Sequence, residues 1–233
     1  MNANSSISAP PESGDLVLDD IAIRRGEHIL LAGLNITLQQ GHAIVIKGGN
    51  GTGKSTLLRT VAGFISPHHG RMSLNGRDFK PHHPDCPLII SSYRGADGLS
   101  EEMDGNTQLR LYQQMRGRHP HLGDAADYDR FFCAPFLGKE VRHLTTGQRQ
   151  RIALTRLCLD LGALAQHHQA GQNLCWLLDE PDSDLDEEGR FVLEELISDM
   201  LGAGGRVMMV SHQPRTLRFP HQTLRLQHQT EQG

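Results

Sequence analysis

The sequence predicts an α/β fold with a parallel sheet at its centre, and three observations carry that prediction. Two short apolar runs, 43–46 and 174–178, have the composition of central parallel strands that are covered on both faces. Each run leads directly into a polar motif. A helical pattern over 56–63 follows the first of these motifs, as a strand–loop–helix unit requires.

Further strands are expected before and between these elements. Loose alternation over 16–23 indicates a first strand, and 29–38 contains a second that ends at the turn 39–41. A turn at 66–70 precedes a strand over 71–74 and the turn signal Asn75-Gly76. The remaining expected strands cover 88–91, 206–211 and 223–226.

The helices expected in the second half are concentrated after residue 96. A polar stretch with spaced apolar residues predicts short helices in a subdomain inserted over about 96–143. Longer helices are expected over 146–161 and 187–201. One main domain over 15–228 would then lie between a disordered tail at 1–14, rich in Ser, Pro and Asn, and a polar tail at 229–233.

Composition limits the possible functions. The chain has 233 residues, enough for one large domain with a sizeable core, and its formal net charge of −4 gives no electrostatic argument for nucleic acid. The four scattered cysteines lack metal-site spacing, and three of them lie in apolar surroundings, which indicates small core residues in a reducing compartment. No apolar stretch approaches 18 residues, so membrane association is expected to come through a partner.

A phosphate-binding loop is the strongest motif, since residues 48–55 match G-x-x-x-x-G-K-[ST] completely. Its glycines let backbone N–H groups converge on phosphate oxygens, and the positive end of the following helix attracts anions. Lys54 can reach the outer phosphates of ATP, and the Ser55 hydroxyl can bind Mg²⁺. The predicted nucleotide-binding residues are Gly48, Gly49, Asn50, Gly51, Thr52, Gly53, Lys54, Ser55 and Thr56.

Two acids follow the buried strand 174–178, at the carboxyl end where parallel sheets bind ligands. Asp179 can order Mg²⁺ and its waters, and Glu180 can orient and deprotonate the water that attacks the γ-phosphate. His212 follows the neighbouring strand. A histidine at this place can hydrogen-bond the γ-phosphate and detect its loss.

A second anion site is expected at the start of the helix at 146, where Gly147 leaves N–H groups and a positive dipole end. One nucleotide hardly needs two such sites in one chain. Two chains facing head to tail would each use Thr145, Gly147 and Gln148 to close the nucleotide of the other.

The order of these motifs resembles the nucleotide-binding domain of ATP-binding cassette (ABC) transporters, over residues 16–226. The resemblance implies a P-loop NTPase of the ABC type, with an inserted helical subdomain and an antiparallel β edge. It implies that 144–148 is the family signature, that Glu180 is the general base and that His212 is the switch histidine. It also implies that 183–186 is a loop that contacts the second copy in a homodimer.

Three departures from the family pattern stand out. The signature reads LTTGQ, so Thr146 replaces a glycine and weakened closure is expected. The family places a Mg²⁺-contacting Gln where Tyr93 or Arg94 stands, and neither replaces an amide oxygen equally well, although Arg94 can instead contact a phosphate. The usual adenine-stacking aromatic is replaced by Arg24-Arg25, and Arg can stack on a purine.

Two sequence segments, 146–157 and 210–214, resemble the corresponding segments in the ATPase of the cytochrome c maturation haem exporter. That resemblance implies a peripheral subunit on the cytoplasmic face of an inner membrane. There it would be paired with integral permease subunits, and ATP turnover would release a haem-loaded chaperone. Two alternatives remain at this stage: the ATPase of another small exporter of lipid, lipoprotein or peptide, and a soluble ABC ATPase without a permease.

Overall fold

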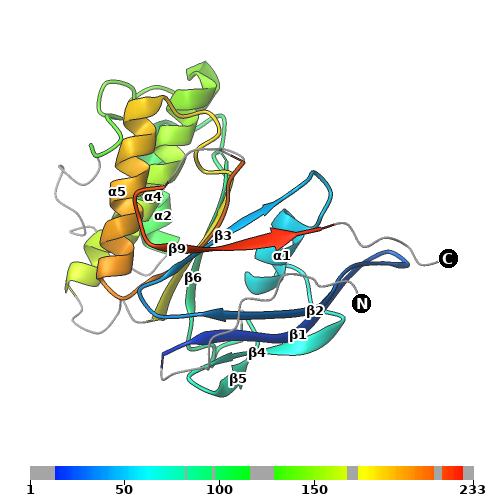
Figure 1. Ribbon diagram of the computed structural model, residues 1–233. Helices are drawn as coiled ribbons and strands as arrows, with labels where there is room; N and C mark the ends of the chain where they lie inside the picture. Colours follow the sequence, from blue (N-terminus) through cyan, green and yellow to red (C-terminus); the bar gives the residue numbers. More distant parts are fainter. Residues whose placement is uncertain are drawn as a thin grey trace.

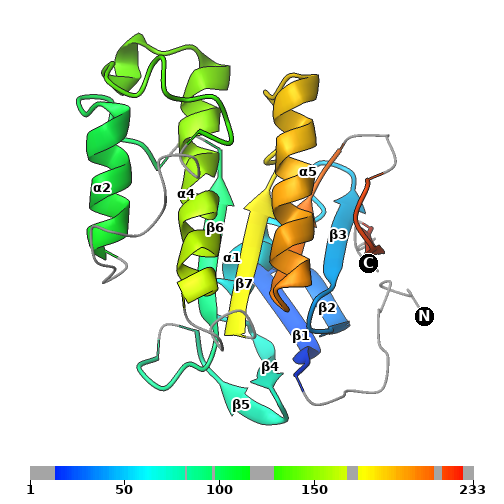
Figure 2. The same ribbon diagram turned by 90° about the vertical axis from the view of Figure 1, so that its left-hand side faces the viewer.

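The computed structural model describes residues 14–81, 83–95, 98–115, 129–166, 173–212 and 217–227. In these ranges a parallel sheet lies between a layer of helices on one face and a second, antiparallel sheet on the other (Figures 1 and 2).

The larger sheet has five strands, and every pair in it is parallel. Its order is β6 (Ile89–Arg94), β7 (Leu174–Asp179), β8 (Arg206–Val210), β3 (Ala43–Gly48) and β9 (His221–Leu226). Because all strands run the same way, their carboxyl ends meet at one edge of the sheet.

The central strands are apolar on both faces because each face covers a different core. Along β3, Ala43 and Val45 belong to the core under the helical layer, whereas Ile44 and Ile46 belong to the core that faces the antiparallel sheet. Trp176 on β7 is fully buried in the helical core. This alternation explains why the sequence shows continuous apolar runs at these strands.

The antiparallel sheet has the order β2 (His28–Leu38), β1 (Leu16–Arg25), β4 (His69–Leu74) and β5 (Arg77–Phe79). Helix α1 (Lys54–Val61) packs Leu57, Leu58 and Val61 into the core between the two sheets. The antiparallel sheet therefore holds the helix that follows the phosphate loop.

Helices α2 (Gly105–Met115), α4 (Thr146–Gln166) and α5 (Glu187–Gly202) cover the opposite face of the parallel sheet, as Figure 2 shows. A short 3₁₀ helix, η1 (Val141–His143), leads into α4. None of the described helices is long and apolar enough to cross a bilayer.

A buried polar cluster ties this helical layer to the sheet. Asp160 on α4 is fully buried and accepts hydrogen bonds from the hydroxyls of Ser91 on β6 and Tyr112 on α2, the latter 3.2 Å from each carboxyl oxygen. The guanidinium of Arg156 lies 5.5 Å from the centre of the Tyr112 ring. The cluster thereby positions β6, whose carboxyl end reaches the site described below.

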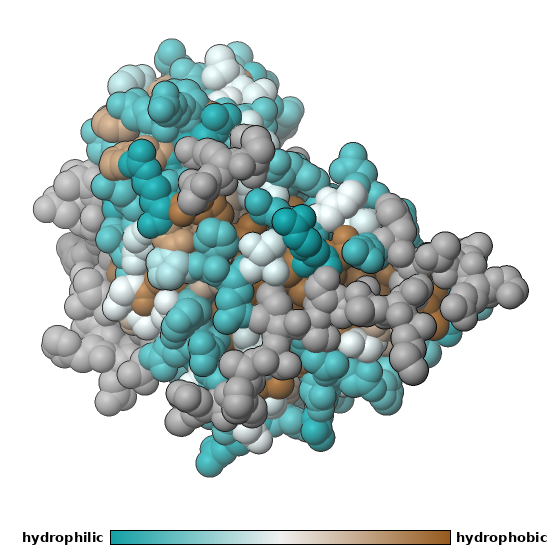
Figure 3. All heavy atoms as spheres, in the orientation of Figure 1, coloured by the Kyte–Doolittle hydropathy of each residue, from teal (hydrophilic) through white to brown (hydrophobic). Residues whose placement is uncertain are grey.

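Hydrophilic residues cover most of the face shown in Figure 3, and hydrophobic residues show mainly between them. Three of the four cysteines are buried, as their apolar sequence surroundings predict, and burial raises the pKa of the Cys133 thiol to about 11 and that of Cys175 to about 12. Thiols of this kind act as small core residues rather than as nucleophiles.

The predicted fold class is confirmed, with differences at single elements. Strand β5 was not expected, α4 continues to Gln166, and β6 continues to Arg94 instead of ending at 91. The expected tail at 1–14 lies outside the described residues except for Gly14, and so does the tail at 229–233. The boundaries of the main domain and of the inserted subdomain stay predictions.

We predict that Tyr112→Phe lowers the free energy of unfolding by about 1–2 kcal/mol, because it removes one hydrogen-bond donor from a buried carboxyl group and keeps the ring under Arg156. Urea denaturation of the full chain measures this. The matched control is Ser198→Ala, which removes a hydroxyl that donates to the helix carbonyl oxygen of Glu194. It should lower the free energy of unfolding less than Tyr112→Phe does. Equal losses from both changes would contradict a special role for the buried cluster.

Candidate nucleotide-binding site

The phosphate loop connects β3 to α1 and is packed tightly on both sides. Gly48 ends β3, and a Cβ atom there would lie 2.5 Å from the carbonyl oxygen of Leu226. Gly53 is the N-cap of α1 with φ 94, and a Cβ atom there would lie 3.1 Å from the side chain of Leu30. Side chains are therefore excluded at both ends of the loop, and its backbone is left to face a ligand.

The start of α1 is suited to an anion. Within the described chain, this helix has no side-chain cap and no acidic residue in its first turn, so its first N–H groups and dipole end remain free for phosphate. Lys54 folds back over the loop and donates to the carbonyl oxygens of Gly48 (3.0 Å) and Gly49 (2.8 Å). Thr52 closes the loop with a 2.9 Å hydrogen bond to Gly49.

Two predicted Mg²⁺ ligands lie together, although 124 positions separate them in the sequence. The Ser55 hydroxyl donates to a carboxylate oxygen of Asp179 over 3.0 Å. One hydroxyl and one carboxylate are hard oxygen donors of the kind Mg²⁺ takes when phosphates and waters complete its shell. The described residues contain no group of three or more His, Cys, Asp and Glu side chains placed to hold a metal.

The predicted catalytic pair is also brought together. Glu180 follows β7 in a left-handed backbone conformation (φ 50), which is uncommon for a non-glycine residue. His212 follows β8, and its Nε2 lies 3.1 Å from Glu180 Oε1. Both side chains are about half exposed, so a substrate can reach them.

The turn after Glu180 is held from two directions. Asp182 is buried and accepts a 2.7 Å hydrogen bond from Ser211, the residue before His212. The Gln150 side chain, buried on α4, donates to the carbonyl oxygen of Pro181 over 2.9 Å. No local pattern marks Ser211, Asp182 or Gln150 as site residues, because their roles depend on contacts between distant segments.

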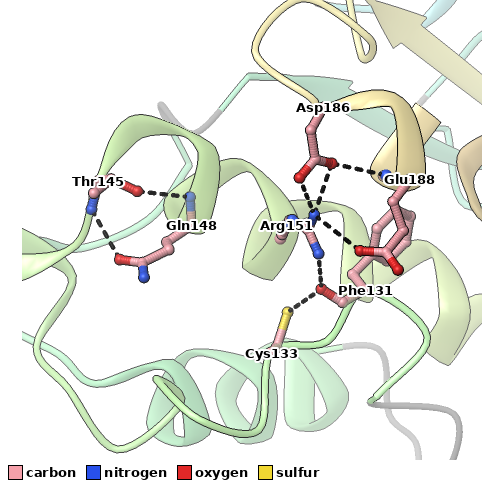
Figure 4. Close-up of polar contacts among 8 residues, drawn as sticks. Phe131, Cys133, Thr145, Gln148, Arg151, Asp186 and Glu188 are labelled. Carbon is pink, nitrogen blue, oxygen red and sulfur yellow. Dashed lines mark hydrogen bonds and ion pairs between the residues drawn. The ribbon is translucent and has the colours of Figure 1, made fainter.

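The start of α4 forms a capping box, shown on the left of Figure 4. The backbone N–H of Gln148 donates to the Thr145 hydroxyl (3.3 Å), and the backbone N–H of Thr145 donates to the side-chain oxygen of Gln148 (3.1 Å). A Cβ atom on Gly147 would lie 3.3 Å from the carbonyl oxygen of Asp184. The signature thus begins a well-capped helix against the 183–186 loop, while its contact with a second nucleotide stays a prediction.

Arg151, one turn further along α4, connects three segments (Figure 4). One of its terminal nitrogens lies 2.7 Å from both carboxylate oxygens of Asp186, and the other donates to the carbonyl oxygen of Phe131 over 2.9 Å. Its side chain is only 12% exposed, so these bonds are partly shielded from water. Arg151 therefore fixes α4 against the start of α5 and the segment before the signature.

Asp186 is the N-cap of α5, where its carboxylate accepts from the Gly189 N–H over 2.8 Å. That backbone hydrogen bond, together with Arg151, lowers the pKa of Asp186 below its usual value. Ionised Asp186 is therefore favoured by folding.

The structure also shows where the residues that depart from the family pattern lie. Tyr93 is buried in the helical core, on the same face of β6 as Ser91. Arg94 lies on the opposite face and is exposed. Arg24, expected near adenine, pairs with Glu27 over 3.2 Å at the turn between β1 and β2, and its stacking on a purine stays a prediction.

These features define a nucleotide-binding ATPase with a P-loop, in which a parallel sheet carries the phosphate loop, the acidic pair and the histidine on neighbouring strand ends. The sequence model described as ABC transporter matches residues 31–183. The chain belongs to the ABC transporter family and is an ATPase of that type.

Similar proteins narrow the position within the family. The chain is 35% identical over 207 residues to the cytochrome c biogenesis ATP-binding export protein CcmA of Methylococcus capsulatus, covering 87% of this chain and 93% of the relative. It is 29% identical to the protein of the same name from Agrobacterium fabrum, covering 86% and 90%. The predicted resemblance to the ATPase of the cytochrome c maturation exporter is thus confirmed.

Solved structures agree with the fold. An ABC transporter ATP-binding protein from Pyrococcus furiosus has a TM-score of 0.68 at 19% identity, over 91% of this chain and 97% of that one. A dimeric ATP-binding cassette in a post-hydrolysis state, bound to ADP and Pi, has a TM-score of 0.67 at 18% identity, over 92% and 97%.

We predict a coupling free energy of about 1 kcal/mol between Arg151 and Asp186 in a double-mutant cycle of Arg151→Met and Asp186→Asn. Asparagine keeps the N-cap acceptor, so the cycle isolates the charge interaction. Chemical denaturation of the full chain and its variants measures it.

The same coupling should depend on pH. Because the pKa of Asp186 is lowered in the folded state, its stabilisation is present above the unfolded-state pKa of about 4 and is lost as pH falls through the lower folded-state value. A coupling that is absent at pH 7, or that grows on acidification, would contradict this assignment.

Proposed function

We propose that this chain is the ATP-hydrolysing subunit of an exporter that serves cytochrome c biogenesis, where ATP turnover drives release of a haem-loaded chaperone. The observation that carries the proposal is the 35% identity, over nearly the full length of both chains, to a protein named for ATP-binding export in cytochrome c biogenesis. The sequence segments 146–157 and 210–214, which resemble those of the cytochrome c maturation ATPase, support the same assignment.

In the proposed mechanism two copies enclose two ATP molecules. The phosphate loop of one copy binds the triphosphate, and Thr145, Gly147 and Gln148 of the second copy close over it. Support comes from the start of α4, where Thr145 and Thr146 are exposed, and from the adjoining 183–186 loop.

In this mechanism, side chains at the carboxyl ends of β7 and β8 carry out ATP hydrolysis. Glu180 takes the proton of the attacking water, and His212, 3.1 Å from that carboxylate, hydrogen-bonds the γ-phosphate. Lys54 neutralises charge on the outer phosphates. Ser55 and Asp179 would hold Mg²⁺, which supplies Lewis-acid stabilisation of the phosphate charge when bound.

The proposed partners are a second copy of this chain and integral permease subunits, which would keep the chain at the cytoplasmic face of an inner membrane. Exposed apolar side chains on α2 are suited to a protein partner: Leu111 is 40% exposed and Met115 is 79% exposed. The alternative is an exporter of lipid, lipoprotein or peptide. This chain has Tyr93 or Arg94 where the family pattern has a glutamine, and this departure is the reason to test the alternative as well.

We predict that Glu180→Gln lowers the ATP turnover rate by about 10²–10⁴-fold, because the amide cannot accept the proton of water. The same variant should accumulate as an ATP-bound dimer, detected by size-exclusion chromatography with ATP. Glu187→Gln, an exposed change in the first turn of α5, is the control and should turn over ATP normally. If Glu180→Gln hydrolyses ATP at the parent rate, Glu180 is not the base.

The cargo assignment is tested in the source organism. Deletion of the gene should abolish covalent haem in c-type cytochromes, measured by haem staining after denaturing electrophoresis. The wild-type gene should restore the staining, and Glu180→Gln should not. Normal c-type cytochromes after deletion would overturn the haem-export proposal and leave the other exporter as the better assignment.

A further inference from the structure

Arg94 lies beside the two residues predicted to hold Mg²⁺. In the register of the parallel sheet Arg94 on β6 pairs with Asp179 on β7, so both stand in the last row of their strands. Alternation along β6 sends Tyr93 into the helical core and leaves Ser92 and Arg94 on the face toward α1.

That face opens into a cavity of about 250 Å³, whose wall includes Ser55, Arg94 and Asp179. The Ser55 hydroxyl and the Asp179 carboxylate are hydrogen-bonded to each other over 3.0 Å at this wall. Arg59, from the last turn of α1, lines the same cavity. The wall of this cavity therefore includes both Arg94 and Ser55, the last residue of the phosphate-loop motif.

The side chain of Arg94 has no hydrogen bond or ion pair with any residue that the structure describes, in contrast with those of Lys54, Ser55 and His212. A guanidinium has only donors, so it cannot be a metal ligand. Its planar set of N–H groups does match phosphate oxygens, and it stays charged at any pH the protein experiences.

We propose that Arg94 binds the terminal phosphate of ATP directly, so that a protein cation takes over part of the charge neutralisation that an amide ligand would leave to the metal. This inference rests on the proposed nucleotide site. Its consequence is a weaker dependence of ATP binding on Mg²⁺. An Arg at this place also gives preference for the triphosphate, since ADP lacks the phosphate that Arg94 contacts.

Equilibrium binding to the full chain tests this, with isothermal titration of ATP and ADP in EDTA and in MgCl₂. In EDTA, Arg94→Gln should weaken ATP binding about tenfold, the loss of one charge-assisted hydrogen-bonded contact, and change ADP binding less than twofold. In MgCl₂ the same variant should bind ATP at least as tightly as wild type, because glutamine restores an oxygen ligand.

Two matched variants separate phosphate contact from general charge. Arg59→Gln removes an equal charge from the same cavity, at the end of α1 away from the loop, and should change ATP binding less than twofold. Arg94→Lys keeps the charge without the planar fork and should fall between wild type and Arg94→Gln. Unchanged thermal unfolding midpoints confirm that the exposed substitutions leave the fold intact.

Wild type and Arg94→Gln binding metal-free ATP equally would overturn the proposal, and so would equal losses from Arg59→Gln and Arg94→Gln. Neither result affects the proposed ATPase. Failure of wild type to bind ATP above the background set by Lys54→Ala, with or without Mg²⁺, would instead overturn both the nucleotide site and this inference.

Discussion

A single row of strand pairing fixes the geometry of the site. Arg94 pairs with Asp179, Asp179 with Val210, and Val210 with Ile46, so residues at or near the carboxyl ends of four parallel strands stand side by side. Glu180 directly follows Asp179 in this row, and His212 and Gly48 come two residues after Val210 and Ile46. The row cannot slip, because alternate side chains of each strand fill two different cores. A shift of one residue would exchange the two cores and turn Arg94 away from the phosphate face.

The second constraint is α4, which holds the segment after Glu180 at both of its ends. Gln150 binds Pro181 and Arg151 binds Asp186, while Ser211 binds Asp182 from the opposite side. The same helix begins with the signature. Direct hydrogen bonds therefore connect the start of α4 to the turn that carries Glu180, and in the proposed mechanism they would couple dimer closure to hydrolysis.

Local motifs were predictable from the sequence, whereas long-range supports were not. The phosphate loop and the Asp179-Glu180 pair are contiguous, and each follows an apolar run that signals its strand. Strand β5 has only three residues and an exposed edge position, and β6 continues beyond the predicted end at Ser91 through Ser92, Tyr93 and Arg94, a segment whose strand conformation depends on pairing with β7. The capping box Thr145-x-x-Gln148 was visible in the sequence but was interpreted only as a nucleotide contact. Arg151 gives no local signal, because its partners lie 20 and 35 positions away.

The polar groups of the site differ in whether they must give up a hydrogen bond within the protein in order to bind a nucleotide. Lys54 already bonds two loop carbonyls, Ser55 bonds Asp179, and His212 pairs with Glu180. Exchanging such bonds for bonds to a ligand contributes little net free energy, since one partner is lost for each one gained. Backbone N–H groups at the start of α1 make no such exchange, because no side chain caps them. Neither does Arg94, to which the described residues offer no partner. These two sources should therefore add to the attraction of the Lys54 charge for a triphosphate, and both lie beside the Ser55–Asp179 pair.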